Sequence, residues 1–409
     1  MKKNEGYAWV IFLCMCAVSL VGFGLVINTV GLFYEPVGKA FGVGRGSVAL
    51  MSTMQNIAAA ITLLFAGRVM TKINLKWVLA GCFAIIGLSL ASLSFARSIT
   101  HFYIAWILIG ICQPFAIALP IPVILGNWFK KKLGTVMGIA LGISAFGGTI
   151  FNPIISSIIT ANGWRAGWLA EGLIVLIVLV PMSLFLLKGK PDSKHAAYGQ
   201  GEVEENAEVE ETGITLKEAT KTPMFYLIAF SMIALQFIAG FVQHISGHIV
   251  NSGLSLTTGA SVVSGVMMGA AVGKILIGYL LDKFNNSFVV GLYTVFGILG
   301  WSGLIVLKSP MMLVSSGFIL GLGQGLLLVA LPYFIRREFG SKDYSNILSI
   351  ISMLGSVSSA AAVSLDGVMF DIQHSYTMPL TLNVILYILA GIAVVMSIRY
   401  THKLLVSKV

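Results

Sequence analysis

The sequence predicts an all-α membrane protein with twelve transmembrane helices in two pseudo-symmetric six-helix bundles. Three observations predict this fold class: the composition, the number of long apolar runs and an internal repeat. The 409 residues are 57% hydrophobic and only 10% charged, whereas ordinary soluble domains carry about 25% charged residues. A chain of this composition cannot cover a water-facing surface with polar groups, so we expect lipid to cover much of it.

Twelve apolar runs are each long enough to cross the roughly 30 Å of hydrocarbon in a bilayer. We expect no cleavable signal peptide before them, because the first apolar run is too long and lacks a small-residue cleavage site. An even number of crossings places both termini on one side of the membrane. The expected helices span residues 8–34, 46–70, 77–97, 102–128, 134–160, 167–187, 223–250, 259–281, 287–307, 311–334, 346–370 and 378–399.

The basic residues indicate which side the termini occupy. The 26 Lys and Arg residues contribute to a net charge of +10. With both termini placed in the cytoplasm, most of them fall at inner helix ends and loops, as the positive-inside rule requires. The basic excess is therefore a topology signal in a plasma-membrane protein, and we expect no nucleic-acid partner. The exceptions are Lys274, inside the membrane, and five outer residues: Lys39, Arg45, Arg97, Arg165 and Lys308.

One polar segment divides the apolar pattern into six runs and six runs. It contains the acidic stretch GQGEVEENAEVEETG, is flanked by lysines and has a single aromatic residue, Tyr198. This composition is typical of a solvated linker. We therefore expect an N-terminal six-helix bundle over residues 1–188, a cytoplasmic linker over 189–221 and a C-terminal six-helix bundle over 222–409.

The two halves resemble each other at a shift of 211 residues. The segment 67–74 then falls on 278–285, and Lys131 falls on Lys342. Gly110 and Gln113 fall on Gly321 and Gln324. Chance matching is the alternative in a glycine-rich chain, but polar residues match as well. Parallel six-helix repeats are typical of secondary transporters, which hold their substrate between the halves.

Several motifs identify a family resemblance. A Gly-x-x-x-Asp-basic motif stands at Gly278, Asp282 and Lys283, and a looser copy with Thr71 in place of Asp follows Gly67. The chain resembles the major facilitator superfamily, and within it the oxalate/formate antiporter and monocarboxylate transporter branch. Four stretches carry the branch resemblance: FYEPVGKAFGV, NWFKKKLGTVMGIALGISAFGG, NPIISSIITANGWRAGWL and HISGHIVNSGLSLTTGA.

The resemblance gives Lys274 a role. Helix 8 of that branch carries a cation, usually Arg, shortly before the second Gly-x-x-x-Asp motif, and this cation is taken to hold the substrate carboxylate. Lys274 lies eight residues before Asp282, about 12 Å along a helix and near the membrane midplane. A lysine there costs several kcal/mol. A bound anion would offset that cost; a structural ion pair or a snorkelling side chain is the alternative.

The remaining polar residues of the membrane helices are weaker candidates. We expect His244 to line the substrate site or to pack against neighbouring helices. His248 lies on the same helical face and the pair could bind a metal ion, but no third metal ligand is nearby in the sequence, so we expect no metal. The oxalate-type members carry a second cation in helix 11. That cation is absent from this sequence, and its absence favours a monocarboxylate. Further substrate-site candidates, each with helix packing as the alternative, are Gln113, Gln324, Asn28 and Tyr34. Candidates for proton coupling or gating are Asp366, Asp282 and Glu35, while Glu171 is expected to be wet or to gate near an outer helix end.

We therefore expect a secondary active transporter of a small organic anion, of the lactate, pyruvate or formate class. It would work by alternating access, with proton coupling or anion exchange. A facilitator-type exporter of drugs or other metabolites is the alternative. An enzyme is not expected, because the sequence has no nucleophile elbow, phosphate loop or His/Cys metal cluster. We expect no cofactor, an organic anion and possibly a proton as ligands, contact with membrane lipid, and a monomer.

Overall fold

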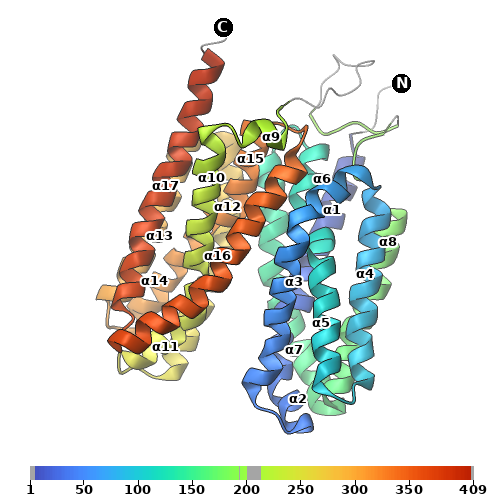
Figure 1. Ribbon diagram of the computed structural model, residues 1–409, viewed down its shortest axis with the longest axis vertical. Helices are drawn as coiled ribbons and strands as arrows, with labels where there is room; N and C mark the ends of the chain where they lie inside the picture. Colours follow the sequence, from blue (N-terminus) through green and yellow to red (C-terminus); the bar gives the residue numbers. More distant parts are fainter. Residues whose placement is uncertain (1–4, 193, 200–212, 407–409) are drawn as a thin grey trace. The chain divides into compact units, whose positions relative to one another are not determined.

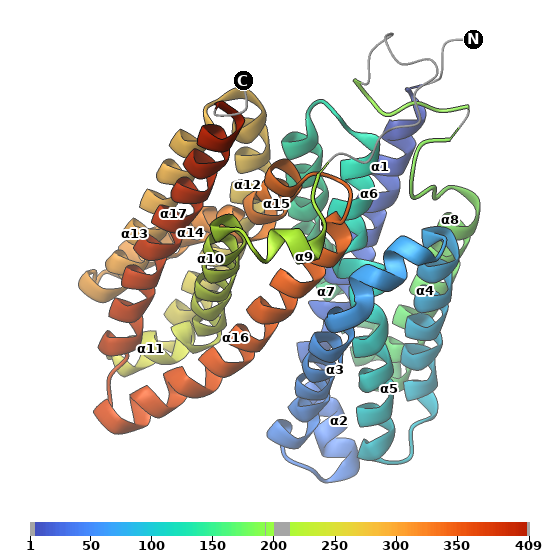
Figure 2. The same cartoon turned by 45° about the horizontal axis from the view of Figure 1, so that its top comes forward.

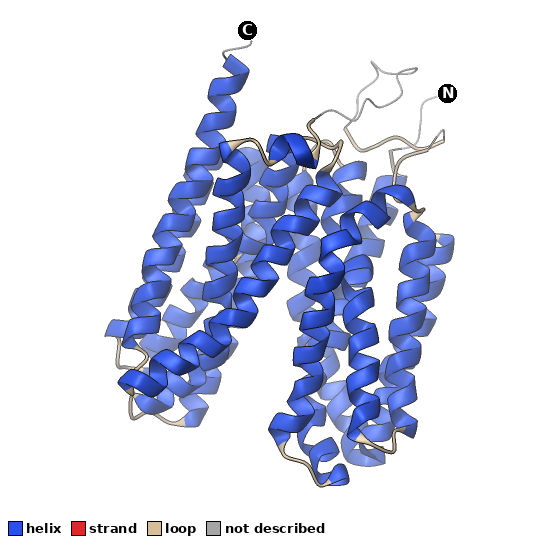
Figure 3. Cartoon of the chain, viewed as in Figure 1, coloured by secondary structure: helices blue, strands red, loops and turns tan. Residues whose placement is uncertain are grey.

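The computed structural model describes residues 5–192, 194–199 and 213–406, and these residues are almost entirely helical (Figures 1 and 3). No strand occurs among them; the extended pairings are two isolated bridges, Phe129 with Tyr198 and Gly213 with Gly340.

The elements up to residue 185 are α1 (Tyr7–Ala17), η1 (Val18–Ile27), η2 (Val30–Phe33), α2 (Tyr34–Phe41), α3 (Arg45–Lys72), α4 (Leu75–Ser92), η3 (Leu93–Phe95), α5 (Ile99–Gln113), η4 (Pro114–Ala118), α6 (Pro120–Trp128), α7 (Leu133–Ile174), η5 (Val175–Leu179) and α8 (Val180–Phe185). Those that follow are α9 (Leu216–Ala219), α10 (Pro223–Gly240), η6 (Phe241–His244), α11 (Ile245–Asn251), α12 (Leu256–Lys283), α13 (Asn286–Val306), α14 (Pro310–Gly323), η7 (Leu326–Ala330), α15 (Leu331–Phe339), α16 (Tyr344–Gln373) and α17 (Thr377–Val406).

Eleven helical segments of the described chain are long and apolar enough to cross a membrane. One of them, Leu133–Phe185, has 53 residues and contains a break at Gly163, where φ is 82° and ψ is 166°. Such a backbone suits glycine because it carries no Cβ. The break leaves two helical sections, each long enough to cross, so the predicted twelve crossings are confirmed.

The predicted repeat reappears in the element boundaries. A shift of 211 residues carries both ends of α3 onto both ends of α12, and both ends of the 3-10 segment η2 onto both ends of η6. The break at η6 means that the span expected over 223–250 is not one continuous helix. The π-helical η4 and η7 interrupt the fourth and tenth crossings at nearly equivalent places. The sequence similarity thus reflects a shared pattern of helix breaks as well as of helices.

Contacts within the chain divide it into two compact units. Unit 1 comprises Met1–Lys131 and Ile143–Glu208, and unit 2 comprises Lys132–Gly142 and Val209–Val409. The first ten residues of α7 therefore cluster with unit 2. In unit 1, α3 lies beside α5 and α4 beside α8; in unit 2, α10 lies beside α16 (Figures 1 and 2), and α12 packs on α14.

The described ends of the linker are docked rather than fully solvated. Tyr198 donates from its backbone N–H to the carbonyl of Trp128 at 2.8 Å and accepts from Lys130 at 3.0 Å. At the other end, the backbone N–H of Leu216 donates to the Asp343 carboxylate at 2.6 Å. Thr215 opens α9 with a capping box. The two described ends of the expected linker therefore make specific contacts while residues such as Asp192 and Lys217 stay exposed, and the acidic stretch at 200–212 lies outside the described residues.

Within unit 2, the start of α7 crosses α12 at glycines. A Cβ on Gly278 would lie 2.1 Å from the carbonyl oxygen of Gly134, and a Cβ on Gly138 would lie 2.4 Å from that of Lys274. Close backbone approach through small residues is how helices associate in membranes. Asp282 completes this crossing: its carboxylate accepts from the N–H groups of Gly134 and Thr135 at 3.0 and 2.7 Å, and from the Thr135 hydroxyl at 2.6 Å. Asp282 thereby satisfies N–H groups that the first turn of a helix leaves free.

We expect Gly278→Ala to destabilise the protein by about 1–3 kcal/mol, because the added methyl group overpacks the crossing. The melting temperature of the purified protein should fall accordingly. Gly291→Ala is the matched control on the neighbouring helix α13, since no atom lies within 4 Å of a Cβ built at Gly291. Equal melting temperatures for the two variants would contradict the tight crossing.

We expect Asp282→Ala to destabilise by about 1.5–3 kcal/mol, the usual range for hydrogen bonds to a charged group. The measurement is again the melting temperature. Lys283→Ala serves as the control, because Lys283 is the exposed neighbour of Asp282 and removing it leaves the cap intact. A normal melting temperature for Asp282→Ala would show that the cap is dispensable.

Candidate functional site

Lys274 lies in the second half of α12, in a buried position. Only 9% of its surface is exposed. The helix is held on two sides at this level: Gly273 meets the backbone of Leu322 on α14, where a Cβ would come within 2.3 Å, and Gly138 meets the Lys274 carbonyl. The Gly273 carbonyl also accepts from the Tyr293 hydroxyl at 2.8 Å. Tight packing fixes the backbone from which the Lys274 side chain extends, and a binding residue requires such a fixed position.

The direction of Lys274 follows from its helical position. At about 100° per residue, Gly273 faces α14 and Gly278 faces the start of α7, so Lys274 projects from the sector between these two contacts. Met267 lies seven residues earlier on the same face and is 50% exposed. The face of α12 that carries the buried Lys274 is therefore exposed two turns earlier, at Met267.

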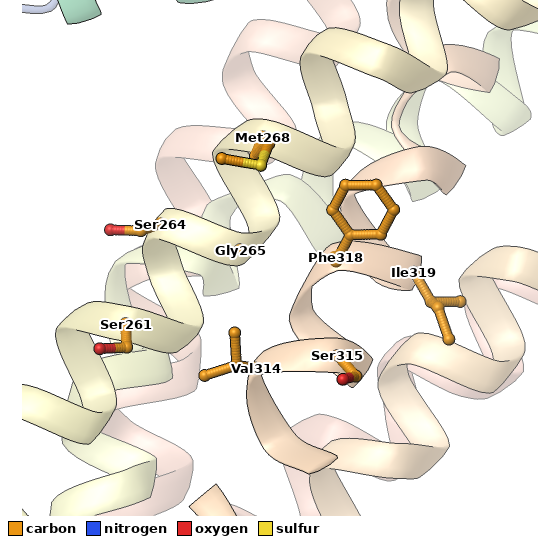
Figure 4. Close-up of a pocket in the computed structure, with 8 residues that line it drawn as sticks. All are labelled: Ser261, Ser264, Gly265, Met268, Val314, Ser315, Phe318 and Ile319. Carbon is orange, nitrogen blue, oxygen red and sulfur yellow. The ribbon is translucent and has the colours of Figure 1, made fainter. Parts of the chain in front are cut away.

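An open groove of about 720 Å³ between α12 and α14 is a separate feature (Figure 4). Lys274 is not among its lining residues. It lies six residues after Met268, about 120° around the helix, so it points away from the groove. The groove has no charged side chain with which to bind an anion. Its lining consists of Ser261, Ser264, Gly265, Met268, Val314, Ser315, Phe318 and Ile319.

The structure brings together His244 and Asp366 from distant parts of the sequence. Asp366 on α16 is 0% exposed, and His244, at the end of η6, interacts with it electrostatically. Neither carboxylate oxygen of Asp366 has a hydrogen-bond partner within the part of the chain that is described. His248 differs from His244, because its Nε2 lies 2.9 Å from the carbonyl oxygen of Leu304, which is a packing contact.

The two repeat-related glutamines have different surroundings. Gln113 accepts from the Gln55 side-chain amide at 3.0 Å, which ties α5 to α3 in unit 1. Gln324, at the end of α14, lines a buried cavity of about 10 Å³ in unit 2, together with Trp301 and Tyr387. That volume is about the space of one water molecule, so this cavity is too small for an organic anion.

The candidates near the C-terminal end of the first crossing all lie in unit 1. The Asn28 side chain is exposed and donates to the Ser144 carbonyl at 3.3 Å. The Tyr34 hydroxyl lies 2.8 Å from that of Ser52. Glu35 belongs to α2, but its side chain lies outside the described residues. Asn28 and Tyr34 therefore lie near each other in sequence but contact different parts of unit 1.

Sequence reasoning missed the character of Glu171. The expectation of a wet side chain is wrong, because the residue is 0% exposed and its Oε1 lies 2.5 Å from the Thr29 hydroxyl, whereas gating stays a prediction. The helical section starts directly after Gly163 and not at residue 167. Glu171 is thus eight residues, about 12 Å, inside it. An acidic residue within an apolar run was the available signal.

Comparisons with known proteins agree with this architecture. The family model described as Major Facilitator Superfamily matches residues 10–262 and 245–407. Monocarboxylate transporter 12 of Homo sapiens is 23% identical over 412 residues, covering 91% of this chain and 77% of the relative. A gallate transporter of Pseudomonas putida is 26% identical over 403 residues, covering 89% and 87%. An uncharacterized MFS-type transporter of Bacillus subtilis, YcxA, is 20% identical over 387 residues, covering 92% and 91%.

Solved structures show the same fold at low identity. The proton:xylose symporter XylE matches with a TM-score of 0.72 and 13% identity, covering 95% of both chains. The fucose:proton symporter FucP of E. coli matches with a TM-score of 0.69 and 14% identity, covering 94% of this chain and 98% of that one. The family model matches nearly the whole length. This chain is a multi-pass membrane transporter of the major facilitator superfamily and not an enzyme.

Proposed function

We propose that this transporter carries a small organic anion, a monocarboxylate above all, and that Lys274 contacts the substrate carboxylate. The observation that carries the proposal is a lysine that is only 9% exposed, deep within α12. A cation costs several kcal/mol at this depth and is kept where it has a function. A carboxylate bound beside it offsets the cost, and a strong charge-assisted hydrogen bond then forms.

The names of two relatives support an anionic substrate. One is a monocarboxylate transporter and the other a gallate transporter, and both names describe carboxylates. Lys presents a single compact charge where Arg would present a planar fork for two oxygens. The sequence of α16 contains no Lys or Arg that could hold a second carboxylate, which favours a substrate with one carboxylate. Gallate widens the candidates from lactate, pyruvate and formate to aromatic acids.

The transport cycle that we propose is alternating access, with a proton or an exchanged anion as the second ligand. Uptake of a lone anion into a cell with a negative interior is unfavourable, so a second ligand must make uptake possible. We assign His244, Gln113, Gln324, Asn28 and Tyr34 as further substrate-site candidates, and we expect the two glutamines to contribute least, because Gln113 bonds Gln55 and Gln324 borders a water-sized cavity. Asp366, Asp282 and Glu35 are assigned to coupling or gating.

We further propose the following organisation in the cell. The bundles 1–188 and 222–409 are joined by a linker over 189–221, both termini lie in the cytoplasm, and the protein works as a monomer in the plasma membrane. The distribution of basic residues supports this orientation. Membrane lipid is then the other partner of the helices.

Substitution of Lys274 tests the substrate assignment. We expect a monocarboxylate to raise the melting temperature of the wild type, and Lys274→Gln to weaken its binding by about 10- to 100-fold, because a charged hydrogen bond is lost. Thermal stabilisation by lactate, pyruvate, formate, acetate, gallate and oxalate is the measurement. Lys274→Arg keeps the positive charge and should retain part of the binding.

Lys283→Gln is the matched control, since it removes an exposed lysine from the same helix and should leave stabilisation unchanged. Cationic drugs are tested in parallel. Stabilisation by drugs and by none of the anions would favour the exporter. An unchanged anion response in Lys274→Gln would remove Lys274 from the substrate site.

We expect Asp366→Asn to slow transport several-fold while leaving anion binding intact, because a gating carboxylate acts on conformational change and not on the substrate. Exchange of radiolabelled anion in proteoliposomes and thermal stabilisation together separate the two effects. Asp192→Asn, in the linker, is the control and should change neither. Loss of binding in Asp366→Asn would instead place Asp366 against the substrate.

A further inference from the structure

Unit 1 contains a buried carboxyl group that the proposed function does not use. Glu171, on the second section of α7, is 0% exposed. Its Oε1 contacts the Thr29 hydroxyl at 2.5 Å, and its Oε2 has no hydrogen-bond partner in the described ranges. Gly172, the next residue, packs against the backbone of Ala91 on α4, which fixes this part of the helix. The carboxyl group therefore cannot move to water without a change in packing.

The hydrogen-bond geometry indicates which atom holds the proton. The Thr29 hydroxyl lies 2.6 Å from the carbonyl oxygen of Leu25 and 2.5 Å from Glu171 Oε1. A hydroxyl has one proton to donate, and threonine in a helix commonly gives it to the carbonyl four residues earlier. The short contact to Glu171 then needs a second proton. A protonated Glu171 supplies it by donating to the Thr29 oxygen.

The surroundings of Glu171 favour the neutral acid. Trp168, one turn earlier on the same helix, stacks on Phe33 at 3.7 Å and lies 6.0 Å from Trp106. An ionised carboxylate in such an apolar place, without a paired cation, costs several kcal/mol. The ion pairs of the described residues do not include Glu171.

The titratable groups on the packed elements have other partners or are thiols. Arg165 donates to the Ala96 carbonyl at 3.1 Å, and His101 contacts the Ser92 hydroxyl at 3.1 Å. Tyr103 donates to the Ser47 carbonyl. The remaining groups with described side chains are Lys76 at the opposite end of α4, Tyr7 at the start of α1, Tyr34 and the exposed Lys39 on α2, and the thiols of Cys14, Cys16, Cys82 and Cys112.

Thr29 links this carboxyl group to the break in the first crossing. It precedes the 3-10 segment η2, and its neighbour Asn28 follows the π-helical η1. Asn28 is exposed, donates to the Ser144 carbonyl and is a substrate-site candidate. A change at Glu171 therefore acts on Thr29, and through one peptide bond on a residue placed to sense the substrate.

We propose that Glu171 is a proton-binding site whose release of the proton is coupled to rearrangement of the first crossing at Thr29; this rests on the proposed function. On release, the Glu171 O–H bond breaks and the proton passes to water. The Thr29 hydroxyl turns from the Leu25 carbonyl to the new carboxylate, which loosens the helix at its break. Entering water then donates to Oε2, which has no hydrogen-bond partner in the described chain.

Infrared difference spectroscopy of the full-length transporter in lipid nanodiscs tests the proton site without any substrate. Wild type minus Glu171→Gln, recorded across a pH titration, should contain the C=O band of a protonated carboxyl at neutral pH and lose it at alkaline pH. Thr29→Val should shift the frequency of this band, because the hydrogen-bond partner is removed. If Glu171→Gln does not fold, the shift of this band between the wild type and Thr29→Val still tests whether Glu171 is protonated. A carboxylate band already at neutral pH, or no shift in Thr29→Val, would overturn the proposal.

Transport tests the coupling. The probe is radiolabelled lactate, pyruvate or gallate, whichever stabilises the wild type, in proteoliposomes. Glu171→Gln should retain exchange across equal pH and lose accumulation driven by a pH gradient. Glu218→Gln, which alters a fully exposed carboxyl of the α9 capping box, should keep both. Gradient-driven accumulation as in the wild type would overturn the coupling role. If the wild type moves none of the anions, the proposed function fails, whereas the infrared titration still decides the proton site.

Discussion

Direct backbone contact at glycines along α12 is the constraint on which the arrangement of unit 2 depends. Gly269 and Gly273 meet α14, and Gly278 meets the start of α7, at separations that no side chain could occupy. Lipid tails are as apolar as the helices, so burial of apolar area alone gives little driving force for association. Close packing and the Asp282 cap supply it instead. Lys274 stands in the middle of these contacts, which explains how a costly cation is held at a constant place.

Duplication explains the scaffold but not the chemistry. Helix ends and breaks recur at the 211-residue shift, yet the ionisable residues of the membrane do not. The position equivalent to Lys274 is Leu63, which is buried, and the position equivalent to Asp282 is Thr71. A charge in the bilayer is expensive, and in each of these two pairs only the position in unit 2 carries one. The two units consequently differ in the ionisable residues that they carry within the membrane.

That division matches the two tasks of the coupled carrier that we propose. Unit 2 holds the buried cation and the neighbouring pair His244 and Asp366, whereas unit 1 holds the carboxyl of Glu171 against Thr29. Both sites lie beside helix irregularities: His244 ends η6, and Thr29 precedes η2. Broken helices leave backbone groups that can change partners at modest cost. A ligand that binds one conformation better than another can therefore shift the balance between them.

The sequence by itself determined the membrane class, the number of crossings, the repeat and the position of Lys274 along its helix, because hydropathy and spacing are local properties of the chain. The roles predicted for single polar residues depended on partners that are distant in sequence. Tertiary structure decided that Gln113 bonds Gln55, that Asp282 caps the start of α7 and that His244 lies close enough to Asp366 to interact with it electrostatically. It also decided that Glu171 is buried, since a three-residue difference in where a helix begins moves a side chain from a membrane edge into the apolar interior. Periodicity reports which residues can share a face, whereas the partner on the facing helix is set by packing that no local pattern encodes.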